Sequence, residues 1–196
     1  MNLPNKLTVS RFALTIAFLA VMFSKVRYHE TIALVLFMAG GITDFFDGYI
    51  ARRDKLITNF GILMDPLADK IMVCSAFIAF VGLNWIPPWM VVIIVARELA
   101  ITGLRLLAAS KGVVLAAEGY GKHKTISQIV AIISILVVAS YTQWGGFGRA
   151  VFGLQLFGEP WVRAFTQFAV WVAVLLTFTS GWLYLWRNRA LYLQDM

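Results

Sequence analysis

The sequence is dominated by apolar segments of about 20 residues, the length that crosses the hydrocarbon core of a bilayer as a helix. We predict six such segments, at 8–24, 31–52, 61–82, 88–109, 125–143 and 164–186. Hydrophobic residues make up 60% of the 196 residues and the mean hydropathy is +0.79, which is too apolar for a water-soluble domain. The sequence therefore predicts an all-α, polytopic membrane protein with six transmembrane helices, forming a single domain over residues 1–196.

The segments between and before these helices predict how the chain sits in the membrane. Residues 1–7 are expected to form a short interfacial helix, and the Gly- and aromatic-rich residues 144–163 an interfacial loop. With six spans and the N-terminus in the cytoplasm, the outer side keeps only Lys25, Arg27, Arg149 and Arg163 of the 17 basic residues. This asymmetry predicts that both termini are cytoplasmic, in a bacterial-type inner membrane. The net charge of +7 then reflects topology and anionic lipid, and nothing in the sequence indicates a nucleic-acid partner.

Charged residues interrupt the second and third apolar segments at helical spacing. At 100° per residue, one stripe of the second helix carries Asp44, Asp47, Gly48, Ala51 and Arg52. The next helix carries Gly61, Asp65 and Asp69 at i, i+4 and i+8, after a short polar turn. Two antiparallel helices would then face each other with carboxylates on both inner faces, near the cytoplasmic side.

Four ionised carboxylates in a low-dielectric site repel one another, so either some are protonated or cations bind them. Oxygen ligands without nearby Cys or His favour a hard cation such as Mg²⁺, Mn²⁺ or Ca²⁺. Two such ions could clamp a phosphate during in-line displacement. The small residues on the same stripes leave room for a ligand, with Arg52 available to its phosphate or base, although small residues are also common where membrane helices pack tightly. Structural burial accounts poorly for the aspartates, because charges inside membrane helices are costly.

The spacing D-x-x-D-G-x-x-A-R-(x)8-G-x-x-x-D-x-x-x-D, from Asp44 to Asp69, resembles the signature of the CDP-alcohol phosphotransferase family. All eight fixed positions are present, which makes the pattern far more specific than a lone glycine motif.

The resemblance implies a reaction in which a CDP-linked lipid, CDP-diacylglycerol, donates its phosphatidyl group to an alcohol and releases CMP. It implies that Asp44, Asp47, Asp65 and Asp69 bind Mg²⁺ or Mn²⁺, with two ions expected. Asp69 would also be the catalytic base on the acceptor hydroxyl, helped by a neighbouring cation because an aspartate alone is a weak base.

The resemblance also implies which residues border the nucleotide of the donor. Gly48, Ala51, Arg52 and Gly61 would border the cytidine nucleotide, and the N-terminal N-x-x-T-x-x-R places Asn5, Thr8 and Arg11 near the donor head group. For the last three residues, a polar helix start with a snorkelling arginine is an equally good interpretation.

Basic residues in and after the fourth segment point to the acceptor. Arg97 and Arg105 are eight residues apart and share a helix face, and Lys122 and Lys124 follow in the next connection. Cations converging near the metal site would bind the phosphate of a phosphorylated acceptor, although the two lysines could also be ordinary cytoplasmic flanking charges. Glu98 is expected to be structural, orienting an arginine or capping a neighbouring helix. His123 is assigned no role.

Three stretches resemble the branch of the family that makes phosphatidylglycerophosphate from sn-glycerol 3-phosphate: N-L-P-N-K-L-T-V-S-R, A-R-E-L-A-I-T-G-L-R and G-K-H-K-T-I-S-Q. Other acceptors, such as inositol phosphate or serine, remain alternatives with the same chemistry. A divalent-cation transporter is an alternative of a different class, although transporter sites usually lie near the bilayer midplane between repeats, and no repeat is visible here. The family resemblance also implies a homodimer.

Overall fold

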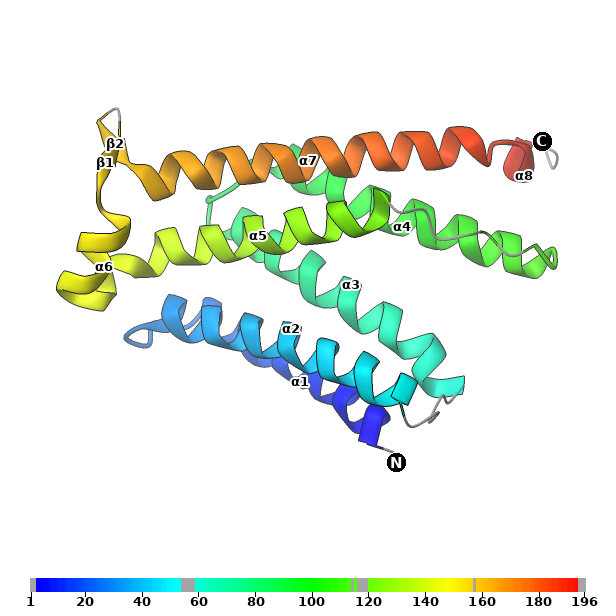
Figure 1. Ribbon diagram of the computed structural model, residues 1–196, viewed down its shortest axis with the longest axis horizontal. Helices are drawn as coiled ribbons and strands as arrows, with labels where there is room; N and C mark the ends of the chain where they lie inside the picture. The colour runs from blue at the N-terminus through cyan, green and yellow to red at the C-terminus, as the bar shows by residue number, and fades with distance from the viewer. Residues whose placement is uncertain (1–2, 54–58, 114, 116–119, 157, 194–196) are drawn as a thin grey trace.

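The computed structural model describes residues 3–53, 59–113, 115, 120–156 and 158–193, apart from the side chains at 3–7, 44–53, 59–63, 65, 66, 69, 120–122 and 193. The described chain is almost entirely helical (Figure 1). Its long helices are α1 (Leu3–Met22), α2 (His29–Arg53), α3 (Asn59–Gly82), α4 (Pro88–Ser110), α5 (Tyr120–Ser140) and α7 (Trp161–Arg187). These six helices occupy the six predicted segments, which confirms the all-α fold.

Local chemistry sets where several of these helices begin and end. Tyr28 and Asn84 adopt positive φ angles of 64° and 59° in the turns before α2 and α4, and Pro88 stands at the start of α4, where its missing N–H costs nothing. α3 begins at Asn59 and continues through Pro66. The helical stripe carrying Gly61, Asp65 and Asp69 therefore starts before the proline, as the sequence pattern required.

The N-terminal residues do not form a separate interfacial helix. Residues from Leu3 onward belong to α1 without a break, because Pro4 falls in the first helical turn, where a proline is tolerated. The interfacial loop predicted at 144–163 also contains regular structure: a 3-10 turn (Tyr141–Trp144), α6 (Gly145–Phe152) and a small hairpin of β1 (Gln155–Leu156) and β2 (Glu159–Pro160). Stacking of Phe152 on Trp161 holds this segment together.

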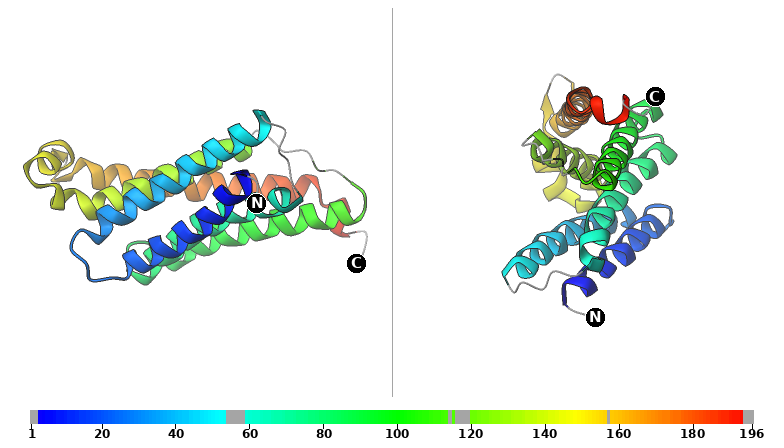
Figure 2. Two further views of the ribbon diagram at one scale, coloured as in Figure 1. Left: turned by 90° about the horizontal axis from the view of Figure 1, so that it is seen from below. Right: turned by 90° about the vertical axis from the view of Figure 1, so that its right-hand side faces the viewer.

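Helices α1 and α2 form one pair and α5 and α7 another; α2 contacts α5 directly, and α4 packs against α7. Helix α3 contacts α1 and α4 (Figures 1 and 2). The core between them is built from large apolar side chains that include Phe18, Phe37, Phe77 and Phe80. Gly40 of α2 faces the end of the Met72 side chain of α3.

Two described segments are long and apolar enough to cross a membrane, 123–152 and 161–187, and three shorter apolar helical segments cover 8–22, 29–43 and 70–82. These features agree with a membrane protein. Both termini, the start of α3 and the end of α4 lie toward the right-hand side of Figure 1, whereas the α1–α2 turn, α6 and the hairpin lie toward the left. The two termini, the start of α3 and the end of α4 therefore lie at the same end of the helix bundle.

Candidate functional site

The eight residues of the aspartate signature lie on the two helices that the sequence predicted. Asp44, Asp47, Gly48, Ala51 and Arg52 belong to the last turns of α2, and Gly61, Asp65 and Asp69 belong to the first turns of α3. Their side chains lie outside the described residues, so the carboxylate positions remain a prediction.

The donor set fits a hard divalent cation by its chemistry, with four carboxylates on two helices joined by a short connection. Among the side chains that the structure describes, no group of three or more His, Cys, Asp or Glu could hold a metal elsewhere. The four aspartates of the signature stay the predicted metal ligands.

Thr8 and Arg11 are buried on α1, the helix that packs against both α2 and α3. Arg11 is only 1% exposed, and Thr15, one turn later, donates a hydrogen bond of 2.8 Å to its carbonyl. A snorkelling arginine would reach water, so the burial excludes that interpretation of Arg11. Buried arginines are rare without an anionic partner or ligand. The side chain of Asn5 lies outside the described residues.

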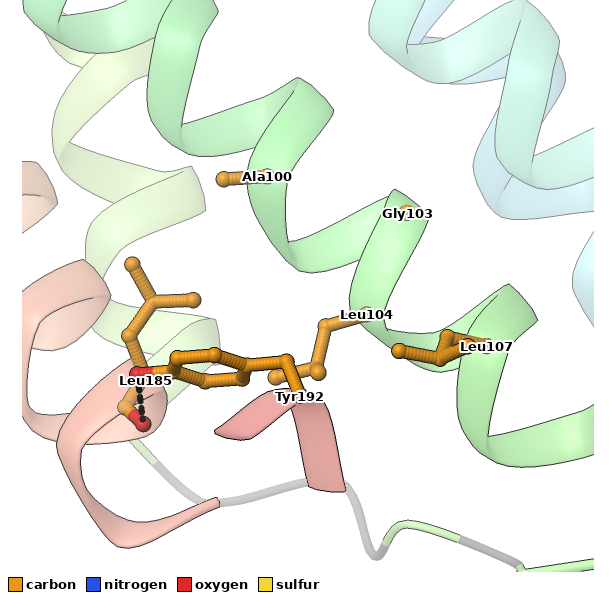
Figure 3. Close-up of a pocket in the computed structure, with 6 residues that line it drawn as sticks. All are labelled: Ala100, Gly103, Leu104, Leu107, Leu185 and Tyr192. Carbon is orange, nitrogen blue, oxygen red and sulfur yellow. Dashed lines mark hydrogen bonds between the residues drawn. The ribbon is translucent and has the colours of Figure 1, made fainter. Parts of the chain in front are cut away.

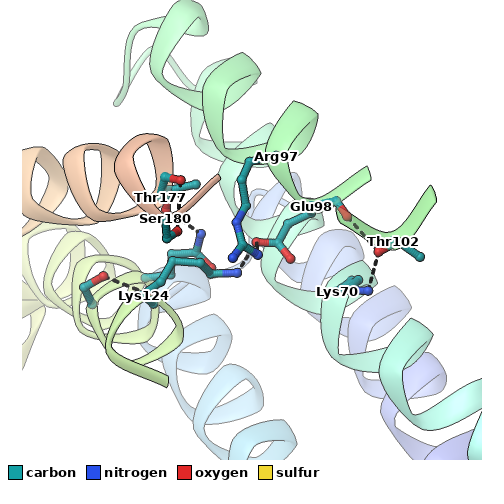
Figure 4. A network of polar contacts seen from close by, with 9 residues as sticks. Lys70, Arg97, Glu98, Thr102, Lys124, Thr177 and Ser180 are labelled. Atoms are coloured by element: carbon teal, nitrogen blue, oxygen red, sulfur yellow. Dashed lines mark hydrogen bonds and ion pairs between the residues drawn. The ribbon is translucent and has the colours of Figure 1, made fainter. Parts of the chain in front are cut away.

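A buried ionic cluster joins α4 to α5 (Figure 4). Glu98 is 6% exposed and accepts from two cations: Lys124 Nζ of α5 contacts its Oε1, and Arg97 Nη1 lies 3.4 Å from the same oxygen. Lys124 is itself only 5% exposed. Two cations share one carboxylate, so the cluster carries a net positive charge in a place where water is scarce. Such a cluster is suited to a further anion.

The cluster extends to α3 through a second polar contact. Lys70 Nζ donates to Thr102 Oγ1, and Thr102 Oγ1 in turn donates to the Glu98 carbonyl at 2.7 Å (Figure 4). Lys70 follows Asp69 directly in the sequence. This contact ties the basic cluster on α4 to the helix that carries two of the signature aspartates.

Helix α7 shapes the side of the cluster that carries Arg97. A Cβ at Gly181 would lie 2.7 Å from Arg97 Cγ, so the arginine stem packs directly on the α7 backbone. Arg97 Nε is buried and has no hydrogen-bond partner among the described residues. A nearby pair, Gln128 Nε2 donating to Thr177 Oγ1 at 3.0 Å, links α5 to α7. The Arg97 side chain is therefore held by packing of its stem on α7 and by the Glu98 carboxylate. Its Nε–H remains available to donate a hydrogen bond.

The four predicted acceptor residues do not all converge in the described structure. Arg97 and Lys124 meet at Glu98, but Arg105 is exposed two turns along α4, where its Nε lies 3.4 Å from the Tyr184 hydroxyl. The side chain of Lys122 lies outside the described residues.

Sequence reasoning missed Lys70, Thr102, Gln128 and Thr177. It assigned Glu98 a structural role, and the observed pairing with Arg97 fits that role. The available signal for Lys70 was its position beside Asp69, and for Gln128 its position as an amide inside an apolar helix.

The chain is similar in sequence to proteins of one enzyme family. The profile of the family described as CDP-alcohol phosphatidyltransferase matches residues 1–179. A CDP-diacylglycerol–glycerol-3-phosphate 3-phosphatidyltransferase of Bacillus subtilis is 39% identical over 95% of both chains. A protein of the same name from Cereibacter sphaeroides is 32% identical over 99% of this chain and 98% of its own. A probable phosphatidylglycerophosphate synthase of Mycobacterium tuberculosis is 37% identical over 92% of this chain and 78% of its own.

The chain belongs to the CDP-alcohol phosphatidyltransferase family. It is accordingly a phosphatidyltransferase that uses a CDP-linked lipid. Proteins of this family generally use divalent metal ions.

Proposed function

We propose that the protein transfers the phosphatidyl group of CDP-diacylglycerol to sn-glycerol 3-phosphate, giving phosphatidylglycerophosphate and CMP. The observation that carries this choice of acceptor is the buried Arg97–Glu98–Lys124 cluster, whose net positive charge suits a phosphorylated alcohol. Serine has no phosphate to occupy it. The names of the relatives from Bacillus subtilis and Cereibacter sphaeroides support the same acceptor.

In the proposed mechanism the four signature aspartates hold the metal, expected to be two Mg²⁺ or Mn²⁺ ions, which would neutralise the diphosphate and the charge that builds on the leaving CMP. Asp69 accepts the proton of the acceptor hydroxyl. The acceptor oxygen bonds to the phosphorus that carries the diacylglycerol, and the bond from this phosphorus to CMP breaks. The resemblance of the aspartate signature to that of the family is the basis for giving Asp69 this role, and the contact of the next residue, Lys70, with Thr102 ties the start of α3 to α4.

The remaining predicted residues position the two substrates. Gly48, Ala51, Arg52 and Gly61 border the cytidine nucleotide on α2 and α3, and Asn5, Thr8 and Arg11 approach the donor from α1. The burial of Thr8 and Arg11 against those helices supports this placement. Arg97 and Lys124 bind the acceptor phosphate, and Arg105 and Lys122 are the two further residues predicted to bind it.

We also propose that all six long helices span the membrane, with both termini and the active site on the cytoplasmic side, and that the protein is a homodimer. The gathering of both termini and the start of α3 at one end of the bundle supports this orientation (Figure 1). Reporter fusions after residue 27 and after residue 193 test it, with external and cytoplasmic signals expected, respectively.

The test of the function is CMP release by the purified protein with CDP-diacylglycerol and Mg²⁺. Glycerol 3-phosphate, inositol 1-phosphate, serine and no acceptor are compared, with Asp69→Asn as the inactive control. Release that requires glycerol 3-phosphate and disappears in the variant is expected.

Other results would change the assignment. Release with inositol 1-phosphate or serine in place of glycerol 3-phosphate would keep the chemistry and refute the acceptor. A folded protein that binds divalent metal but releases no CMP with any acceptor would favour the transporter interpretation.

A further inference from the structure

A cavity of about 470 Å³ lies at the end of the bundle opposite the aspartate signature, bordered by α2, α5, α7 and the turn before α4 (Figure 1). This volume is in the range of small-molecule sites, about 300–1,000 Å³. The lining combines one carboxylate, Glu30 of α2, with one guanidinium, Arg163 of α7. The apolar cavity between α4, α7 and α8 (Ala190–Leu193) has, in contrast, no charged residue in its lining (Figure 3). The cavity that carries both charges, here called the Glu30 cavity, is therefore suited to a charged ligand.

A chain of hydrogen bonds fixes the Glu30 carboxylate at the wall of this cavity. Trp144 Nε1 donates to Thr31 Oγ1, and Thr31 Oγ1 donates to Gln143 Oε1, both at 3.0 Å. Gln143 Nε2 in turn donates to Glu30 Oε2, and His29 Nδ1 lies 3.2 Å from the same oxygen. The other oxygen, Glu30 Oε1, accepts no hydrogen bond from a described residue. The carboxylate is thus oriented from the 3-10 turn while one of its oxygens stays available to a ligand.

The α7 side of the cavity carries the positive charge. Arg163 and Gln167 are four residues apart on α7 and both line the cavity, so they share one face of the helix. Within the described part of the chain, the Arg163 guanidinium has no ion-pair partner, and no ion pair joins it to Glu30. A carboxylate and a guanidinium that line one cavity without pairing are suited to a ligand that carries both charges.

The position of the cavity along the helices favours a lipid head group. Helices α5 and α7 belong to 123–152 and 161–187, the two described segments that are long and apolar enough to cross a membrane. Arg163 is the third residue of the second segment, and the lining residues from α5 are all apolar. Trp85, which also lines the cavity, is of the residue type that gathers at the membrane interface. The charged groups of the Glu30 cavity therefore lie at the level where head groups are found.

We propose that the Glu30 cavity binds the head group of a zwitterionic phospholipid with a primary ammonium, phosphatidylethanolamine, in the leaflet opposite the active site. The proposal rests on the membrane insertion of α5 and α7 proposed above, and it does not depend on the reaction. The ammonium donates to Glu30 Oε1 and lies against the Trp85 indole, since cations are attracted to aromatic rings. The Arg163 guanidinium, with the Gln167 amide beside it, binds the phosphate. A choline head group has no N–H to donate to the carboxylate, and a glycerol head group has no cation.

The experiment is native mass spectrometry of the full-length protein, released from detergent that contains equal amounts of phosphatidylethanolamine, phosphatidylcholine and phosphatidylglycerol with matched acyl chains. Glu30→Gln removes the negative charge with little change of shape, and Arg163→Gln removes the positive charge of an exposed side chain, so that folding is retained. Glu159→Gln and Arg149→Gln are the matched controls, since both side chains are exposed at the same end of the bundle and do not line the cavity. Asp69→Asn detects any lipid held at the catalytic site instead. Free phosphoethanolamine is offered in a separate sample.

The wild-type protein is expected to retain one phosphatidylethanolamine in preference to the other two lipids. Glu30→Gln should lower the preference for phosphatidylethanolamine over phosphatidylcholine about tenfold, because a hydrogen bond between two charged groups is lost. Arg163→Gln should lower the retention of both lipids about tenfold, because both carry the phosphate. The two matched controls and Asp69→Asn should bind lipid as the wild type does, and CMP release should be unchanged in Glu30→Gln and Arg163→Gln.

Equal retention of the three lipids by the wild-type protein would overturn the proposal, as would unchanged binding in either Glu30→Gln or Arg163→Gln. Loss of the lipid in a matched control or in Asp69→Asn would place the lipid outside the Glu30 cavity and refute it. Free phosphoethanolamine that binds as tightly as the lipid would show that a soluble zwitterion, not a lipid, is the occupant. CMP release, measured on the same samples, reports separately on the proposed function, so the two proposals can fail independently.

Discussion

Gly181→Ala tests whether the stem of Arg97 is held in place by α7. The added Cβ would lie 2.7 Å from Arg97 Cγ, whereas an ordinary contact begins at 3.4 Å, so the stem must move by about 0.7 Å (3.4 − 2.7). Displacements of about 1 Å at a substrate-positioning group can cost about a hundredfold in rate, so a loss of about tenfold in kcat/KM for glycerol 3-phosphate is expected. Overpacking of this kind also costs about 1–3 kcal/mol of stability.

The assay measures CMP release while glycerol 3-phosphate is varied at saturating CDP-diacylglycerol, and then the reverse. The loss should appear in the KM for glycerol 3-phosphate, with the KM for CDP-diacylglycerol unchanged, because the donor residues lie on other helices. Gly146→Ala on α6 is the control, since a Cβ there meets nothing within 4 Å. Wild-type kinetics in Gly181→Ala, or equal losses for both substrates, would refute the role given to Arg97.

Three further outcomes are expected. Glu98→Gln leaves two buried cations without their carboxylate and should lower the unfolding free energy by about 3–5 kcal/mol. Adding Lys124→Met should recover part of this loss, and an unchanged thermal melt of Glu98→Gln would contradict the pairing. Chelation with EDTA should abolish CMP release, and Mg²⁺ should restore it; activity that persists in EDTA would exclude the metal role. Gln143→Leu removes hydrogen bonds to Glu30 and Thr31 at the opposite end of the bundle, and should cost about 1–3 kcal/mol of stability while kcat stays unchanged.

The sequence alone predicted most of the fold because a helix satisfies all the backbone hydrogen bonds of an apolar segment of about 20 residues within the segment itself. The incorrect predictions concerned the N-terminal residues and the segment that precedes α7. The predicted separate interfacial helix is the start of α1, and the loop at 144–163 holds α6 and a hairpin. Short elements of that kind depend on contacts such as Phe152 with Trp161, which no periodicity reveals.

For the site, the sequence determined which residues share a helix face. The eight-position signature identified the aspartates, their helices and the family, because spacing along one helix is a property of the chain itself. What only the tertiary structure decided is which faces meet. Glu98 pairs with Lys124, 26 residues away, and Lys70 reaches Thr102, 32 residues away. Which helices become neighbours depends on close packing between side chains and backbone, as where the Arg97 stem packs on Gly181. Such a fit exists only once the helices are assembled.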